Sequence, residues 1–470
     1  MDFEDIISRA KELIAHPVYS VSDDMVSSAV EKIKSKTPKS AGLFNEAKEC
    51  IPGGSQHMMA CGNPHSITIK RSFGAEMWDV DGNQYLDYMM AMGPIILGHN
   101  YPPLIDKMIA VIRDEGVATG LASEWEIKGS RQIKKHFKSI DRVRYFQSGT
   151  EADMAAARLA RAYTGKKKIV RIGGAYHGWS SEFLFDMQIP YSGPFQTAGV
   201  PEEYYMHVVA VPPNDVGALE SAFKEAEQQG GVAALFLEPS GPETGAIPID
   251  PGFNRIAREV CDQHKALLVF DEVVTGFRLA MGGAQEFYNV EADLTVLGKL
   301  ITHGFPSSGA LGGREEIMDC LAGLPPGKPK PFVAGTVAAN PISTAATYWA
   351  VKFIEEENAI EKANQKAIQL SDGLNEIFER LKLPFFSHTC ASLVHFETTA
   401  PLFVDIRNQE KIGEALARKQ AVDDLSVVLL AEGIQTKYGA RAFTCMAHTD
   451  ENIAYTLEVF ENIMSHMIQK

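Results

Sequence analysis

ALLVFDEV, at positions 266–273, is an apolar run that ends in two carboxylates, and a shorter run, DLTVLGK, follows at positions 293–299. Both have the length and composition of buried strands. Open α/β sheets bind ligands at the carboxyl ends of their strands, so we expect Asp271 and Lys299 to face one small molecule. Lysine forms a Schiff base with an aldehyde, and a buried carboxylate keeps a pyridine nitrogen protonated. The pair therefore suits pyridoxal phosphate, although each run alone is more often a strand followed by a polar turn.

A second stretch, YFQSGTE at positions 145–151, leads from an expected strand into an alanine-rich helix expected over 152–163. The N-terminus of a helix binds phosphate through its free backbone N–H groups and its dipole. Ser148, Gly149 and Thr150 are therefore candidates for a phosphate-binding cup. The alternative is an ordinary capped helix with no ligand.

Several motifs occur in an order that resembles the class III pyridoxal-phosphate-dependent aminotransferases, and within them the chain is most similar to the glutamate-1-semialdehyde 2,1-aminomutase branch. The resemblance spans about residues 45–465. It rests on SGTEA at 148–152, AYHG at 175–178, DEVVTGFR at 271–278, Lys299, Gly335-Thr336 and Asn340-Pro341. Several spaced motifs in the right order are more specific than any one of them.

The resemblance implies fold type I and a set of roles at the reacting end of the cofactor. Lys299 is implied as the Schiff-base lysine and as the proton shuttle at the substrate α-carbon. Asp271 is implied as the partner of the pyridine nitrogen. Val273 and Tyr176 are implied on the two faces of the ring, although a core tyrosine is the alternative for Tyr176.

The resemblance also implies how the phosphate is held. Gly149 and Thr150 belong to the cup, and Thr336 is expected to reach the phosphate of the neighbouring subunit. Two half-sites that complete each other imply a homodimer as the smallest active unit.

The expected substrate-recognition residues depart from the aminomutase branch. In that branch an arginine that receives the substrate carboxylate follows Pro-Gly-Gly, whereas SQHMMAC follows it here, at 55–61. A tryptophan of the branch is replaced by Met92, and an acidic residue by Ala440. His57, Met58, Met59 and Met92 are expected at the substrate, and the methionines predict an amine or amino acid with a less acidic side chain than glutamate semialdehyde.

Arg441 lies where many other class III aminotransferases place the arginine that clamps an α-carboxylate. A planar fork of donors matches a carboxylate in a bidentate way. The alternative is a surface arginine in the small domain.

Three functions follow from these observations. The leading one is an aminotransferase that moves an amino group from an amino acid or amine to a keto acid or aldehyde, by a ping-pong cycle through the Lys299 Schiff base. The second is an intramolecular aminomutase or an amino-acid epimerase on the same scaffold. The third is a non-catalytic α/β protein, which the presence of Lys299 and Asp271 argues against.

Composition agrees with a globular enzyme, with 45% hydrophobic and 22% charged residues in a chain of 470. The net charge of -15 argues against nucleic acid or an anionic membrane as a partner. Six scattered cysteines and an N-terminus without a targeting pattern favour a cytoplasmic protein, and no apolar stretch is long enough to span a bilayer. Histidines such as His57, His99, His303 and His388 show no metal-site spacing, so no metal is expected.

The chain predicts an α/β protein with a large, mostly parallel sheet domain and a smaller C-terminal α/β domain. Residues 1–90 are expected to form a helical extension and a small antiparallel segment with a hairpin at Asp81-Gly82, residues 91–340 the cofactor-binding domain, and residues 341–470 the small domain. The expected strands of the large domain are 143–148, 168–173, 207–211, 232–238, 266–273 and 294–298. A final helix is expected over 451–468. The long connection 179–205 is either a lid or an ordered surface excursion.

Overall fold

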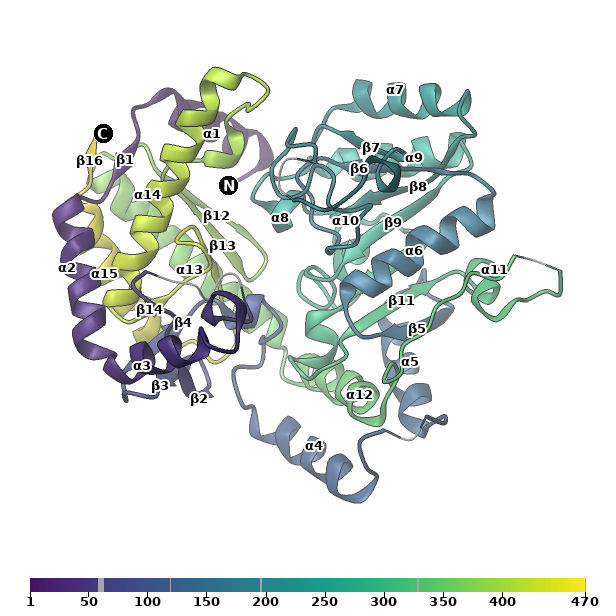
Figure 1. The fold of residues 1–470 in the computed structure, drawn as a ribbon, viewed down its shortest axis with the longest axis horizontal. Helices are drawn as coiled ribbons and strands as arrows, with labels where there is room; N and C mark the ends of the chain where they lie inside the picture. Colours follow the sequence, from purple (N-terminus) through teal and green to yellow (C-terminus); the bar gives the residue numbers. More distant parts are fainter. Residues whose placement is uncertain (58–62, 119, 195–196, 328, 470) are drawn as a thin grey trace. The chain divides into compact units, whose positions relative to one another are not determined.

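The computed structural model describes the whole chain except residues 58–62, 119, 195–196, 328 and 470 (Figure 1). The described residues form two compact units. Unit 1 comprises residues 1–101, 361–404 and 408–470, and unit 2 comprises residues 102–360 and 405–407. The sequence predicts three consecutive parts instead. The two ends of the chain share one unit because strand β14 (Ile434–Gln435) pairs in parallel with β4 (Gln84–Asp87).

Unit 2 is built on a seven-stranded sheet in the order β5-β11-β10-β9-β8-β6-β7. Its strands are β5 (Arg142–Phe146), β6 (Lys168–Ile172), β7 (Val208–Val211), β8 (Val232–Leu237), β9 (Leu267–Glu272), β10 (Leu294–Leu297) and β11 (Gly309–Gly313). The six strands expected from the sequence all form, and the α/β class with a mostly parallel sheet is confirmed. The seventh strand, β11, is antiparallel to both β10 and β5.

Helices cover both faces of this sheet (Figure 1). On one face α6 (Gly149–Thr164) packs over the centre, and on the other lie α7 (Val216–Glu227) and α9 (Pro251–Gln263). The side chains of β9 alternate between the two layers: Leu267 and Val269 join the cluster under α6, whereas Leu268 and Phe270 join the cluster under α7 and α9. A strand that is buried on both faces explains the continuous apolar run that ends at Asp271.

The described part of unit 2 contains six further α-helices. They are α4 (Pro102–Asp114), α5 (Glu124–His136), α8 (Pro242–Gly245), α10 (Gly283–Tyr288), α11 (Glu315–Met318) and α12 (Pro341–Glu356). In the described part of the connection 179–205 the only regular element is a 3-10 turn at Glu202–Tyr204, and Phe183 is buried in the core. At least the beginning of this connection is therefore packed against unit 2.

Unit 1 combines helices with three small sheets. Its helices are α1 (Phe3–Ala15), α2 (Asp23–Lys36), α3 (Pro38–Ala47), α13 (Ala359–Arg380), α14 (Ile412–Ala431) and α15 (Asp450–Met464). The sheet β14-β4-β3-β2 adds β2 (Ile69–Phe73) and β3 (Glu76–Asp79), and a second sheet contains β12 (Phe386–Cys390), β13 (Leu393–Glu397) and β15 (Arg441–Phe443).

Two details of unit 1 bear on the sequence-based expectations. The predicted hairpin turn at Asp81-Gly82 lies between β3 and β4, with Gly82 at a φ of 97°. The helix expected over 451–468 ends at Met464, because Ile468–Gln469 (β16) pairs with Tyr19–Ser20 (β1). Among the described residues, no helix is both long and apolar enough to cross a membrane.

Candidate active site

The carboxyl ends of the parallel strands in unit 2 bring the predicted lysine and carboxylate to one edge of the sheet. Asp271 is near the end of β9, and Lys299 begins the short 3-10 turn that follows β10. The two strands are neighbours, with Asp271 in register with Val296. Lys299 has a φ of 45°, which residues other than glycine rarely adopt, and such backbone is concentrated at functional sites.

The Ser148–Thr150 cup lies at the N-terminus of α6. Ser148 is the N-cap residue, and its Oγ accepts a hydrogen bond from the Glu151 N–H at 3.3 Å. The Glu151 carboxylate in turn accepts from the Gln147 N–H at 2.9 Å. The first N–H groups of a helix have no intrahelical partner, so this capped and closely held end is suited to an anion.

Glycines allow three segments to meet around Val273. A Cβ added at Gly149 would lie 2.8 Å from a methyl group of Val273, and one added at Gly298 would lie 3.1 Å from its other methyl group. Gly178 has a φ of 82°, and a Cβ there would lie 2.7 Å from the Cα of Thr150. The cup, the segment after β10 and the AYHG turn are therefore in close contact, and larger residues would push them apart.

Tyr176 and Val273 are held next to the carboxylates of the site. The Val273 N–H donates to Oδ1 of Asp271 at 3.0 Å, and the Tyr176 N–H donates to Oε1 of Glu238 at 2.8 Å. Tyr176 is 39% exposed, so it is not a core tyrosine. Its ring is accessible for stacking on a planar ligand.

His177 forms a hydrogen bond with Asp271, and the sequence alone predicts no role for it. Its Nδ1 lies 2.8 Å from Oδ2 of Asp271, and both side chains are buried. The segment that carries His177 is held by the buried guanidinium of Arg171, which donates to the carbonyls of Ala175 and Phe183. Burial lowers the pKa of Arg171 to about 10 and also lowers the pKa of His177.

Glu238 is a second residue without a sequence-based role. It directly follows β8, the neighbour of β9, and accepts hydrogen bonds from the backbone N–H groups of Tyr176, Glu243 and Thr244. Burial raises the pKa of Glu238 to about 7, and the charge of Asp271 adds to this effect. The signal that could have found it is its position, since a carboxylate after the neighbouring strand must reach the same edge of the sheet.

Lys299 is the basic group of this edge. Burial lowers the pKa of its amine, while the nearby charges of Asp271 and Glu238 act in the opposite direction. A lysine must lose its proton to act as a nucleophile or base, so a lowered pKa is the shift that this chemistry needs.

The residues of this edge fit pyridoxal phosphate. An amine, a buried carboxylate, a half-exposed tyrosine ring and a capped helix N-terminus match its aldehyde, its pyridine nitrogen, its ring and its phosphate. Thr336, expected at the neighbouring subunit's phosphate, is exposed in this chain. Its neighbour Gly335 lies beside Gln147 and Glu151, the two residues that flank the cup.

The predicted substrate residues belong to unit 1. Arg441 is buried at the start of β15, in register with His395 of β13. His57 is exposed, and its N–H donates to the Oγ of Ser55 at 3.2 Å. Met92 is half-buried with a φ of 68°. Met58 and Met59 lie outside the described residues.

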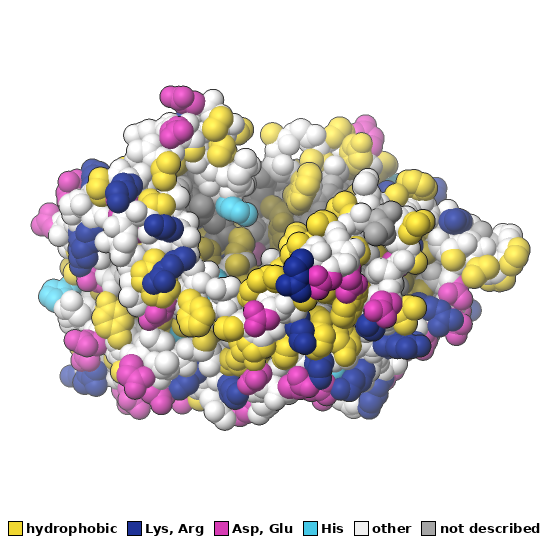
Figure 2. Space-filling view, turned by 90° about the horizontal axis from the view of Figure 1, so that it is seen from below, with side chains coloured by type: hydrophobic (Ala, Val, Ile, Leu, Met, Phe, Trp, Pro, Cys, Tyr) yellow, Lys and Arg dark blue, Asp and Glu magenta, His cyan; other side chains and the backbone are white. Residues whose placement is uncertain are grey.

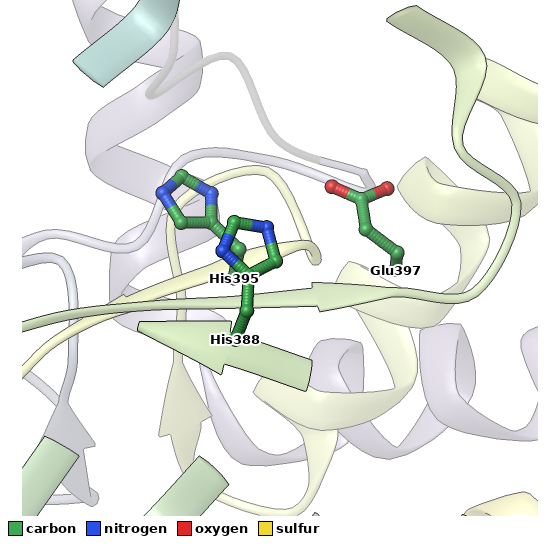
Figure 3. A group of neighbouring side chains, drawn as sticks. All are labelled: His388, His395 and Glu397. Atoms are coloured by element: carbon green, nitrogen blue, oxygen red, sulfur yellow. The ribbon is translucent and has the colours of Figure 1, made fainter. Parts of the chain in front are cut away.

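Unit 1 also contains a buried group of His388, His395 and Glu397, on strands β12 and β13 (Figure 3). Three potential ligand atoms lie within 4.8 Å of one another. The two imidazole rings are stacked, with centroids 4.7 Å apart and planes 14° from parallel. The lone pairs of imidazole nitrogens lie in the ring planes, so stacked rings cannot both point a lone pair at one ion. In this arrangement the group does not offer converging metal ligands.

Comparison with known proteins gives a consistent result. A family model described as aminotransferase class-III matches residues 58–384. The chain is 36% identical over 432 residues to a glutamate-1-semialdehyde 2,1-aminomutase of Syntrophobacter fumaroxidans, covering 89% of this chain and 96% of that protein. It is similar to the crystal structure of an omega-transaminase from Sphaerobacter thermophilus (TM-score 0.82, 26% identity, 92% and 98% of the two chains). It is also similar to a glutamate-1-semialdehyde-aminomutase from Pseudomonas aeruginosa (TM-score 0.81, 25% identity, 98% and 99% of the two chains).

Proposed function

The chain belongs to the class III aminotransferase family, whose cofactor is pyridoxal phosphate, and from this premise we propose that it transfers an amino group from an amino acid or amine to a keto acid or aldehyde. The observation that supports catalysis is the meeting of Lys299 and Asp271 at the ends of adjacent strands. The sequence after Gly54, where Ser55, Gln56 and His57 occur and the aminomutases that the chain resembles carry an arginine, counts against glutamate semialdehyde as the substrate, although it does not count against an amino-acid epimerase.

Each residue of the site has a defined task in this proposal. When bound, pyridoxal phosphate supplies an aldehyde that takes up the amino group and a ring that accepts electrons. Lys299 would hold the aldehyde carbon and would move the proton at the substrate α-carbon. Asp271, whose orientation is fixed by hydrogen bonds with Val273 and His177, would keep the pyridine nitrogen protonated. Tyr176 would pack on the ring.

Substrate binding is assigned to Arg441. We expect its guanidinium to receive the carboxylate of the amino donor in a bidentate way. Replacing Arg441 by lysine keeps the charge but removes the fork, so kcat/KM should fall by about tenfold or more for donors that carry a carboxylate. For a simple amine donor it should change little. Equal losses for both donors, measured in steady-state kinetics, would assign Arg441 a structural role instead.

The alternative function is an intramolecular aminomutase. Its support is the name of the relatives, since the curated protein compared above is a glutamate-1-semialdehyde 2,1-aminomutase at 36% identity. Met92 and Ala440, which differ from that branch, argue for the aminotransferase.

The deciding experiment is spectroscopic. The protein is reconstituted with pyridoxal phosphate, and its visible absorbance band is recorded while amino donors are added one at a time without any acceptor. An aminotransferase should lose the band with particular donors and recover it when a keto acid or aldehyde is added. Lys299→Ala is the control, because it removes the amine that the exchange requires. Complete conversion of glutamate semialdehyde without acceptor, and no band change with any donor, would decide for the mutase.

A homodimer is part of this proposal. Figure 2 shows hydrophobic side chains gathered on one face of unit 2. Large apolar residues of this unit are highly exposed, among them Ile109 at 52%, Leu121 at 81% and Phe332 at 75%. Exposed apolar patches mark interaction surfaces, and a second copy would cover them. Light scattering should give twice the 51.5 kDa mass of one chain, and a mass of one chain at micromolar concentration would contradict the proposal.

A further inference from the structure

Glu238 is a buried carboxylate that joins two separate turns of unit 2. It directly follows β8 and is 7% exposed. Its Oε1 accepts hydrogen bonds from the backbone N–H groups of Tyr176, at 2.8 Å, and of Glu243, at 3.3 Å. Its Oε2 accepts from the backbone N–H of Thr244 at 2.8 Å and from the Thr244 hydroxyl at 3.2 Å. The mechanism proposed above gives this carboxylate no task.

The turn at residues 241–245 has a backbone conformation that its own residues disfavour. Glu243 and Thr244 have φ angles of 53° and 54°, in the left-handed region that residues with a Cβ rarely adopt. Gly241 has a φ of 108°, and a Cβ there would overlap a backbone carbonyl oxygen. Such backbone persists only where surrounding contacts hold it. The Glu238 carboxylate supplies such contacts, because it binds the N–H groups of both left-handed residues.

The other turn is the segment AYHG, at positions 175–178, which is attached to three strands of the sheet. The Ala175 carbonyl binds a residue of β6, and the His177 ring binds a residue of β9. Between them, the Tyr176 N–H binds Glu238 at the end of β8, the strand that lies between β6 and β9. Glu238 therefore fixes the point of the backbone from which the half-exposed Tyr176 ring projects.

In the described chain, the four groups that bind the Glu238 carboxylate are all donors, and this decides which side chain can replace it. A carboxylate accepts on both of its oxygens. A glutamine would turn an NH2 group toward the N–H of either Tyr176 or Thr244, so one of the two turns would lose its contact. An aspartate keeps the charge but is one methylene shorter, so it could not reach both turns.

We propose that Glu238 is a positioning residue: its two oxygens join the AYHG turn to the turn at residues 241–245, and this bridge holds the Tyr176 ring where it packs on the cofactor. A side chain that is held in place before the ligand arrives loses less freedom on binding, so the bridge should strengthen cofactor binding. This inference rests on the place of Tyr176 in the proposed function, but it does not depend on which amino-transfer reaction follows.

Amide hydrogen exchange of the cofactor-free protein tests the bridge itself. In Glu238→Gln, the amide of Tyr176 or of Thr244 loses its acceptor, so exchange in the peptide that covers that turn should accelerate by about tenfold or more. Glu243→Gln is the matched control, because it removes a carboxylate from the same turn and keeps the backbone N–H. Both turns of this control should exchange as in the wild type. Unchanged exchange in both turns of Glu238→Gln would overturn the proposal.

Spectroscopy of the reconstituted protein tests what the bridge does for the cofactor. We measure the dissociation constant of pyridoxal phosphate and the visible circular dichroism of the bound cofactor, which reports how its ring is held. Glu238→Gln and Glu238→Asp should each weaken binding by about tenfold or more and change the circular dichroism per bound cofactor, as is usual when an orienting partner is lost. Wild-type values in Glu238→Asp would overturn the proposal, because they would assign the effect to charge alone.

A double variant tests whether the effect passes through the ring of Tyr176. Tyr176→Ala removes the ring but keeps the N–H that Glu238 binds. In this background Glu238→Gln should cause no further loss of cofactor affinity, and additive losses would overturn the proposal. Thermal unfolding of each variant establishes that it is folded. The exchange measurement involves no cofactor and no reaction, so failure of amino transfer, with these results intact, would overturn only the proposed function.

Discussion

Two glycines of unit 2 share a left-handed backbone but differ in what surrounds them. Gly165 ends α6 with a φ of 71°, and a Cβ there would meet nothing within 4 Å. Gly178 has a φ of 82°, and a Cβ there would press on Thr150 of the phosphate cup. The backbone cost of alanine is about 1–2 kcal/mol at either position. Only at Gly178 is there an additional steric cost.

Substituting alanine at Gly165 and at Gly178 gives two predictions that can be compared directly. Gly165→Ala should lower the thermal stability of the protein and leave the affinity for pyridoxal phosphate unchanged. Gly178→Ala should lower both, because Thr150 must move away from the phosphate. Equal affinities of the two variants, measured by titrating the apoproteins with cofactor, would show that the close approach to Thr150 has no importance for binding.

Sequence reasoning reached some residues of the site and not others. Lys299 and Asp271 could be predicted because each ends an apolar run and has a side chain with distinctive chemistry. His177 could not, since its importance depends on a hydrogen bond to Asp271 on β9, a contact between a loop and a strand that no spacing along the chain encodes. His388 is a similar case: it lies seven residues from His395, and only the antiparallel pairing of β12 and β13 brings the two together.

At the scale of elements, the caps of two helices can be compared. Ser148 caps α6 and Ser22 caps α2, in both cases by accepting from the N–H three residues on, at 3.3 Å and 3.2 Å. A serine cap contributes about 1 kcal/mol to stability. The two helices differ in that only α6 begins at the carboxyl edge of the large sheet.

We therefore expect two different outcomes from the same substitution. Ser148→Ala and Ser22→Ala should each destabilise the protein by about 1 kcal/mol in urea unfolding. Only Ser148→Ala should also weaken the binding of pyridoxal phosphate, and inorganic phosphate should compete less well with the cofactor in this variant. A loss of affinity in Ser22→Ala of the same size would attribute the effect to general stability.

The strand that the sequence did not predict is β11, and its composition explains why. GALGG at positions 309–313 has no β-branched residue and three glycines, which is unfavourable for a strand. The glycines are required by close packing: a Cβ at Gly312 would overlap Ile140, and one at Gly313 would lie 2.7 Å from the carbonyl oxygen of Asp293. Tertiary packing therefore outweighs local propensity in this strand.

At the scale of the whole molecule, buried carboxyl groups connect stability to pH. Burial raises the pKa of Glu238, Glu272 and Glu397 to about 7 from an ordinary value of 4.5. The folded state then binds these protons more tightly than the unfolded state does. The stabilisation that protonation gives is complete below pH 4.5 and is lost as the pH rises to about 7.

The urea midpoint of the apoprotein should therefore fall between pH 5 and pH 8, by an amount that corresponds to about 3 kcal/mol for each such group. Glu397→Gln should make the fall shallower, because an amide cannot ionise. Arg441 acts against the shift at Glu397, so Arg441→Lys, which keeps the charge, serves as a control that should retain the wild-type slope. A midpoint that rises with pH in the wild type and in Glu397→Gln alike would contradict the assignment.

The division of the chain between the two units has a consequence for its synthesis. Residues 1–101 emerge first from the ribosome, but β4 must wait for its partner β14, which is made more than 300 residues later. Unit 2 is almost one continuous segment, residues 102–360, and every strand of its sheet is available before the rest of unit 1 exists. Nascent chains released at about residue 365 should therefore already resist protease over unit 2, with the N-terminal segment still open to cleavage.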